Sequence, residues 1–120
     1  MSALILIADD DDFIRDVLKE MLSRYEVVEA ENGARAVQQF QAHRPHLILM
    51  DILMPEMDGI QATRKILGMD KDAVVLGFSA FAAVKGEDML RAGAREIISK
   101  PVRMPELLEK VQTYLDGNEK

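Results

Sequence analysis

Short apolar runs alternate along the chain with longer stretches in which apolar residues recur every three or four positions. The apolar runs are rich in Val, Ile and Leu and occupy residues 3–8, 25–30, 46–50, 73–78 and 96–99. The amphipathic stretches occupy residues 12–24, 33–43, 59–68, 82–92 and 105–115. Five strands alternating with five helices are typical of a doubly wound parallel sheet with helices on both faces. We therefore predict an α/β fold.

Three of the apolar runs contain almost no polar positions, namely residues 4–7, 47–50 and 74–76. A strand that is apolar on both faces is covered on both faces, so these runs should form the centre of the sheet. The ends of the helices agree with the pattern. Asn32 can cap the second helix, Pro105 suits the first position of the fifth, and Gly68 and Gly93 are expected to end helices.

Length and composition limit the classes of protein. With 120 residues the chain can bury about two thirds of its unfolded surface, enough for one core. We expect one domain over residues 1–120, without an output domain, and a monomer. The longest apolar run is much shorter than the roughly 20 residues of a membrane span, and no basic segment precedes it. The absence of Cys excludes disulfides and thiolate zinc sites and favours the cytoplasm. A net charge of −6 argues against direct binding of nucleic acid.

Polar side chains follow four of the five predicted strands. Residues 9–12, all Asp, follow the first strand, Asp51 the third, Ser79 the fourth, and Lys100 the fifth. Because ligands of such sheets bind beyond the carboxyl ends of the strands, these side chains should meet in one site.

The four consecutive Asp residues have two explanations. Asp11 and Asp12 fit the N-terminus of a helix, where carboxylates accept amide hydrogen bonds and interact favourably with the dipole. Asp9 and Asp10 lie at the end of the strand, where they would repel Asp51 unless a cation or a proton offsets the charge. Oxygen ligands alone favour a hard ion such as Mg2+. A carboxylate, a divalent ion, a lysine and a hydroxyl are the groups that phosphoryl transfer requires.

Ordered motifs at these positions resemble the receiver domains of bacterial two-component response regulators, over the whole chain. They are Leu6-Ile7-Ala8-Asp9-Asp10-Asp11, Leu49-Met50-Asp51-Ile52-Leu53-Met54-Pro55-Glu56-Met57-Asp58-Gly59, Phe78-Ser79-Ala80 and Ser99-Lys100-Pro101. The resemblance implies a flavodoxin-like fold of five parallel strands in the order 2-1-3-4-5, flanked by five helices. It also implies a cis Lys100-Pro101 bond.

The resemblance implies a role for each matched residue. Asp51 is the expected phosphoacceptor and also a Mg2+ ligand. Asp10 is a direct Mg2+ ligand, Asp9 a ligand through water and the Leu53 carbonyl a further ligand, while Ser79 and Lys100 bind phosphoryl oxygens. Such a protein catalyses only its own phosphorylation and dephosphorylation. Its expected partners are a sensor histidine kinase or a histidine phosphotransfer protein, which docks on the first helix, and a downstream protein target.

One position of the expected switch departs from the family. Ile97 stands where the family usually carries Tyr or Phe, so switching would have to proceed without an aromatic ring, through Ser79 and the fourth helix. Ile97 and Val84 are expected contacts on an output face formed by the last strand and the last two helices. Leu53 and Phe81 are expected to flank the phosphorylation site.

Three alternatives from other classes stay open. A haloacid-dehalogenase-type phosphatase also carries Asp-x-Asp after its first strand, but it needs an acidic pair downstream of the lysine. A flavodoxin-like flavin protein shares the fold, yet four Asp residues would repel the flavin phosphate. The third alternative is an interaction module of receiver shape that is never phosphorylated.

Overall fold

The computed structural model describes residues 3–80 and 82–117, with the side chains of residues 82–84 and 117 left out. The strands are β1 (Leu4–Ala8), β2 (Glu26–Ala30), β3 (Leu47–Met50), β4 (Val75–Ser79) and β5 (Ile97–Ser99). The helices are α1 (Asp12–Met21), α2 (Gly33–His43), α3 (Gly59–Met69), α4 (Ala82–Ala92) and α5 (Met104–Gly117). In the described part of the chain, no helix is long and apolar enough to cross a membrane.

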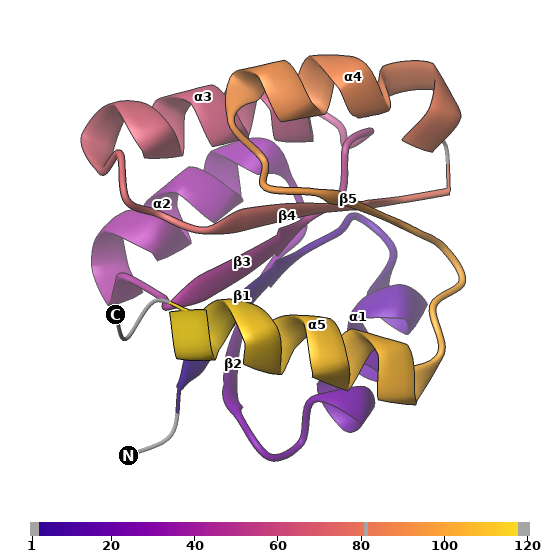
Figure 1. The fold of residues 1–120 in the computed structure, drawn as a ribbon. Coiled ribbons are helices and arrows are strands. Elements are labelled where there is room, and N and C mark those ends of the chain that lie inside the picture. The colour runs from indigo at the N-terminus through magenta and orange to yellow at the C-terminus, as the bar shows by residue number, and fades with distance from the viewer. Residues whose placement is uncertain (1–2, 81, 118–120) are drawn as a thin grey trace.

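All five strands are parallel and lie in the order β2-β1-β3-β4-β5, as expected. Figure 1 shows α2, α3 and α4 on one face of the sheet and α1 and α5 on the other. The strand order reverses between β1 and β3, and the switch point in strand order is where ligands of such sheets bind.

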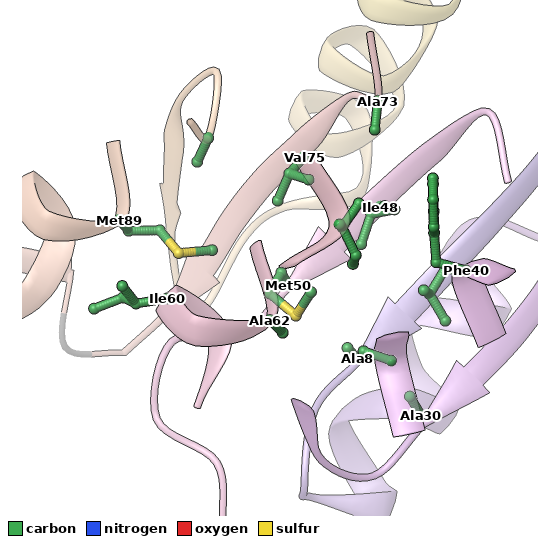
Figure 2. Packing of buried hydrophobic residues seen from close by; sticks show 14 of the residues in the cluster. Ala8, Ala30, Phe40, Ile48, Met50, Ile60, Ala62, Ala73, Val75 and Met89 are labelled. Atoms are coloured by element: carbon green, nitrogen blue, oxygen red, sulfur yellow. The ribbon is translucent and has the colours of Figure 1, made fainter. Parts of the chain in front are cut away.

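The central strands are apolar throughout because each of them serves two cores. In β3, Ile48 and Met50 point into the core under α2, α3 and α4, while Leu47 and Leu49 point into the core under α1 and α5. Successive strand residues face opposite sides of a sheet, so a strand covered on both sides needs apolar residues at every position. Figure 2 shows part of the first core, including Met50, Ile60 and Met89.

Several predicted boundaries require correction. The first helix ends at Met21 rather than at residue 24. Leu22 leaves the helical conformation, and its side chain is fully buried in the core before β2 begins. Gly68 does not end α3, which continues to Met69. The fifth helix begins at Met104, so Pro105 occupies its second position.

Other caps are confirmed. The Asn32 side chain accepts a hydrogen bond from the Arg35 backbone N–H (2.7 Å) at the start of α2. Gly93 follows α4 with a φ of +121°, a conformation that favours glycine. The Asp11 side chain caps α1 by accepting hydrogen bonds from the backbone N–H groups of Phe13 and Ile14. Asp11 therefore serves the helix, as one of the two explanations for the Asp run predicts.

Candidate functional site

A pocket of about 250 Å³ lies at the carboxyl edge of the sheet, beside the switch point between β1 and β3. Its walls come from the segments that follow β1, β3, β4 and β5. The lining residues are Asp9, Asp10, Asp11, Asp51, Leu53, Ser79, Ala80 and Lys100. The structure thus brings together every residue for which the sequence predicts a role in metal or phosphoryl binding.

Asp51 occupies the floor of the pocket and is only 6% exposed. Its backbone N–H donates to the Ala8 carbonyl (2.9 Å), which ties the residue to β1, and its Oδ1 accepts from the Ile52 backbone N–H (2.9 Å). Burial and the neighbouring Asp9 carboxylate raise the pKa of Asp51 from 3.8 to about 6, against the opposing effect of Lys100. Asp51 is therefore a buried carboxylate whose charge is poorly compensated within the protein.

Lys100 provides the positive charge of the pocket. Its Nζ lies 2.5 Å from Asp9 Oδ2 and 3.4 Å from Asp51 Oδ2, so the ammonium group bridges two buried carboxylates but binds Asp9 more closely. The Lys100-Pro101 bond is cis, as expected from the resemblance. One ammonium group faces two buried carboxylates and the exposed Asp10, so the pocket retains negative charge for a cation.

Three carboxylates converge where a metal ion would bind. Asp9, Asp10 and Asp51 each offer an oxygen, and these oxygens lie within 4.8 Å of one another. Asp9 is 1% exposed, whereas Asp10 faces solvent at the mouth of the pocket. Carboxylate oxygens around a small open site suit Mg2+, which retains several waters. The residues present therefore fit the ion that the sequence predicts.

The backbone around Asp51 depends on a close approach by α3. A Cβ on Gly59 would lie 1.9 Å from the Asp51 carbonyl oxygen, so only glycine fits at this position. The preceding Asp58 caps α3, and its side chain accepts from the Gln61 backbone N–H (2.9 Å). In the Asp58-Gly59 pair of the motif, Asp58 starts the helix and Gly59 lets it contact the backbone of Asp51.

The predicted switch residues lie on neighbouring strands. Ser79 is buried at the last position of β4, rather than just after the strand, and lines the pocket. Ile97 points inward: its Cδ1 lies 2.6 Å from where a Cβ on Gly77 would be, and its Cγ1 3.6 Å from the equivalent point on Gly86. Two glycines, one in β4 and one in α4, thus make space for a side chain that is not aromatic.

Leu53 and Phe81 are the two residues predicted to flank the phosphorylation site. Leu53 is 42% exposed and lines the pocket beside Asp51, as expected. Phe81 and the side chain of Val84 lie outside the described residues.

A second, apolar hollow of about 480 Å³ opens beside the pocket, on the face of α1. It shares Asp11, Ala80 and Lys100 with the acidic pocket. Its apolar walls come from α1, β4 and the segment after β5, namely Phe13, Ile14, Val17, Leu18, Met21, Phe78, Pro101 and Val102. Phe13 is 71% exposed, so part of the apolar face of α1 remains uncovered.

Two residues that were not predicted from the sequence support the site. Arg15 donates a hydrogen bond to the backbone carbonyl of Asp9, and Gly33 lets the start of α2 contact the loop after β3. Arg15 stands three positions after Asp12, a spacing that places both side chains on one face of a helix and is the signal that could have indicated an ion pair.

Comparisons with known proteins agree with this geometry. Residues 5–112 match the sequence profile of the response regulator receiver domain. The chemotaxis protein CheY of Bacillus subtilis is 42% identical over 120 residues, which cover 97% of this chain and all of that protein. A CheY-like receiver domain protein from Methanospirillum hungatei has the same fold, with a TM-score of 0.93, 31% identity and coverage of 99% of this chain and 98% of that one.

A third comparison concerns the metal. The crystal structure of a CheX–CheY–BeF3–Mg2+ complex from Borrelia burgdorferi matches with a TM-score of 0.85 and 31% identity, and the match covers 92% of this chain and 87% of that one. That structure holds Mg2+, and the three clustered carboxylates of this chain suit the same kind of ion.

Proposed function

The chain belongs to the response regulator receiver domain family, a family of phosphorylation switches, and we propose that Asp51 is the residue that accepts the phosphoryl group. The observation that carries the proposal is the buried Asp51 carboxylate, placed opposite Asp9 and Asp10 and within reach of Lys100. The donor is a phosphohistidine on a sensor histidine kinase or on a histidine phosphotransfer protein. The protein acts as a switch and not as a conventional enzyme.

The transfer is a displacement at phosphorus. A carboxylate oxygen of Asp51 attacks, a P–O bond forms, and the P–N bond to the imidazole breaks as its electron pair returns to the ring nitrogen. With a pKa of about 6, Asp51 is mostly ionised at neutral pH and therefore ready to attack. Bound Mg2+ supplies positive charge to the carboxylates and to the phosphoryl oxygens.

The other residues of the pocket hold charge or orient groups. Asp9, Asp10 and the Leu53 carbonyl would hold the ion. Lys100 and the Ser79 hydroxyl bind phosphoryl oxygens after transfer. Before transfer, Lys100 Nζ lies closer to Asp9 than to Asp51. Because a phosphoryl group increases the negative charge on residue 51, we expect Lys100 to leave Asp9 and bind a phosphoryl oxygen.

The hollow on α1 is the proposed docking site for the histidine-bearing helical partner. It opens directly beside the acidic pocket and shares residues with it, so a helix seated there would present a histidine to Asp51. The exposed Phe13 offers an apolar anchor at its edge. Apolar side chains in such a hollow match the way in which amphipathic helices bind grooves.

The output is proposed to pass through the face formed by α4, β5 and α5. Drawing Ser79 toward a phosphoryl oxygen would move the start of α4, while Ile97 follows without the burial of an aromatic ring. Exposed apolar residues occur on both of these helices, Leu90 on α4 and Met104 at the start of α5, and suit a downstream protein target. We propose a cytoplasmic, monomeric receiver that binds neither nucleic acid nor membrane directly.

Mass spectrometry after incubation with acetyl phosphate and Mg2+ tests the proposal. One phosphoryl group should appear on the wild type and be lost in Asp51→Asn. Asp58→Asn is the matched control: it changes another Asp of the same loop, and Asn caps helices as well as Asp does, so labelling should persist. Undiminished labelling of Asp51→Asn would refute the proposal. A wild type that binds Mg2+ but takes no phosphoryl group would favour the interaction module that is never phosphorylated.

A further inference from the structure

We infer that Arg15 is a positioning residue, which sets the direction of the metal-binding carboxylates by holding the peptide bond between Asp9 and Asp10. This inference rests on the proposed function, because it takes Asp9 and Asp10 as the residues that hold the ion. Arg15 itself touches neither the ion nor the phosphoryl group. It acts from α1, through the backbone of the loop that carries the ligands.

The guanidinium group of Arg15 connects three segments of the chain. Its Nη1 donates to the backbone carbonyl oxygen of Asp9 (2.5 Å), and its Nε donates to Glu29 Oε1 on β2 (3.0 Å). Its Nη2 forms an ion pair with Asp12, one turn earlier on α1. The Arg15 side chain is only 11% exposed, and its bonds to Asp9 and Glu29 are partly buried, whereas the Asp12 side chain is 87% exposed. Guanidinium offers planar donors in a fixed fork, which a lysine does not.

The carbonyl that Arg15 holds belongs to the peptide bond joining Asp9 to Asp10. Fixing that carbonyl fixes the plane of the peptide, and the plane decides where the Cα–Cβ bond of Asp10 points. Asp9 has further anchors: its N–H donates to the Ala30 carbonyl (3.0 Å), and its carboxylate binds Lys100 and the Asp11 N–H. Removal of Arg15 should therefore disturb Asp10 more than Asp9.

Asp10 has few restraints of its own. It is exposed, and within residues 3–80 and 85–116, no side chain or backbone N–H forms a hydrogen bond or ion pair with its carboxylate. A metal ligand that is free to rotate must lose that freedom on binding, which weakens the site. The peptide plane held by Arg15 removes part of this freedom in advance.

Glu29 orients the guanidinium group in turn. It lies on β2, opposite Ile7 of β1 in the sheet register, and its second oxygen accepts from Lys19 Nζ (2.9 Å). A chain of contacts thus runs from β2 through Glu29 and Arg15 to the Asp9 carbonyl. Lys19 shares the carboxylate of Glu29 but contacts neither Asp9 nor Asp10, which makes it the matched control.

Charge and geometry predict opposite effects of removing Arg15. A cation near the pocket repels Mg2+, so its removal would tighten metal binding if charge alone mattered. Loss of the held peptide plane would weaken binding instead. Groups that orient metal ligands typically contribute about tenfold or more to affinity. The sign of the change therefore distinguishes a positioning role from an electrostatic one.

The experiment is a titration of the metal-free protein with MgCl2 alone, followed by amide chemical shifts and by calorimetry, without any phosphodonor. Arg15→Met should weaken Mg2+ binding about tenfold, with the largest changes in shift at Asp10. Arg15→Lys, which retains the charge but not the fork, should weaken it similarly. Glu29→Gln retains Arg15 and serves if Arg15→Met does not fold. It should weaken Mg2+ binding less than Arg15→Met does. Lys19→Met should bind Mg2+ as the wild type does.

Two results would overturn the inference: unchanged or tighter Mg2+ binding by folded Arg15→Met, or wild-type affinity in Arg15→Lys. If Arg15→Met does not fold, wild-type affinity in Glu29→Gln would overturn it as well. Failure of the proposed function looks different, because the wild type would then take no phosphoryl group on Asp51 whatever the affinities of the Arg15 variants. A wild type that is phosphorylated on Asp51, with equal Mg2+ affinity in all variants, would remove the role of Arg15 alone.

Discussion

Replacing Asp51 by Asn should stabilise the metal-free protein even though it abolishes the proposed function. In the folded protein, burial and the Asp9 carboxylate raise the pKa of Asp51 from 3.8 to about 6. The ionised form is therefore disfavoured by folding, and Asn removes that charge while preserving the shape of the side chain. Its amide oxygen can still accept the hydrogen bond from the Ile52 N–H.

The size of the effect follows from the pKa values. A difference of one between the pKa values of the folded and unfolded states corresponds to roughly 1.4 kcal/mol, so a change from 3.8 to about 6 amounts to about 3 kcal/mol at neutral pH. The pKa of about 6 already includes the opposing attraction of Lys100, so this figure is the upper end of the gain of about 1–3 kcal/mol that we expect in the free energy of unfolding.

The dependence on pH has a definite sign. Between about pH 4 and pH 6 the folded wild type binds a proton on Asp51 that the unfolded chain has released, so its stability falls as pH rises through this range. The destabilising contribution is complete above about pH 6 and absent below about pH 4. The advantage of Asp51→Asn should therefore be large at about pH 7.5 and small at about pH 4.

Urea unfolding in the presence of EDTA measures the effect at both pH values. Asp16→Asn, at an exposed position on α1, serves as control and should change stability by less than about 0.5 kcal/mol. Mg2+ at a hundred times its dissociation constant should add about 2.7 kcal/mol to the wild type and so reduce the difference. If Asp51→Asn is no more stable than the wild type at about pH 7.5, ionised Asp51 does not destabilise the folded protein, and the prediction is wrong.

Three further predictions concern docking, switching and packing. Phe13→Ala should slow phosphotransfer from the cognate kinase but leave labelling by acetyl phosphate unchanged; equal slowing of both would contradict a docking role for the α1 hollow. Beryllium fluoride with Mg2+ should shift amide signals mainly over residues 79–91, whereas shifts confined to the pocket would indicate binding without switching. Gly33→Ala should destabilise the fold by about 1–3 kcal/mol in urea unfolding, because its Cβ would lie 2.1 Å from the Met57 carbonyl oxygen. The control Gly68→Ala should stabilise the fold by about 0.5–1 kcal/mol, because its Cβ would have nothing within 4 Å and alanine favours a helix.

The sequence by itself determined the fold and the membership of the site. The alternation of apolar runs with amphipathic stretches requires strands and helices in turn, and the apolar character of β1, β3 and β4 on both faces requires helices on both sides. Because the strands are parallel, the residues that follow their carboxyl ends lie at the same edge of the sheet. For this reason Asp9, Asp51 and Lys100 could be predicted to share a pocket without knowledge of the coordinates.

The tertiary structure decided how the charges in that pocket are arranged. Lys100 lies 91 residues after Asp9, and its preference for Asp9 over Asp51 depends on how β5 and β1 place their ends in space. The contact between Arg15 and the Asp9 carbonyl likewise depends on Glu29, which comes from the neighbouring strand. Hydrophobic periodicity is a local property of the chain, whereas these ion pairs join residues that only the packed sheet brings within a few ångströms.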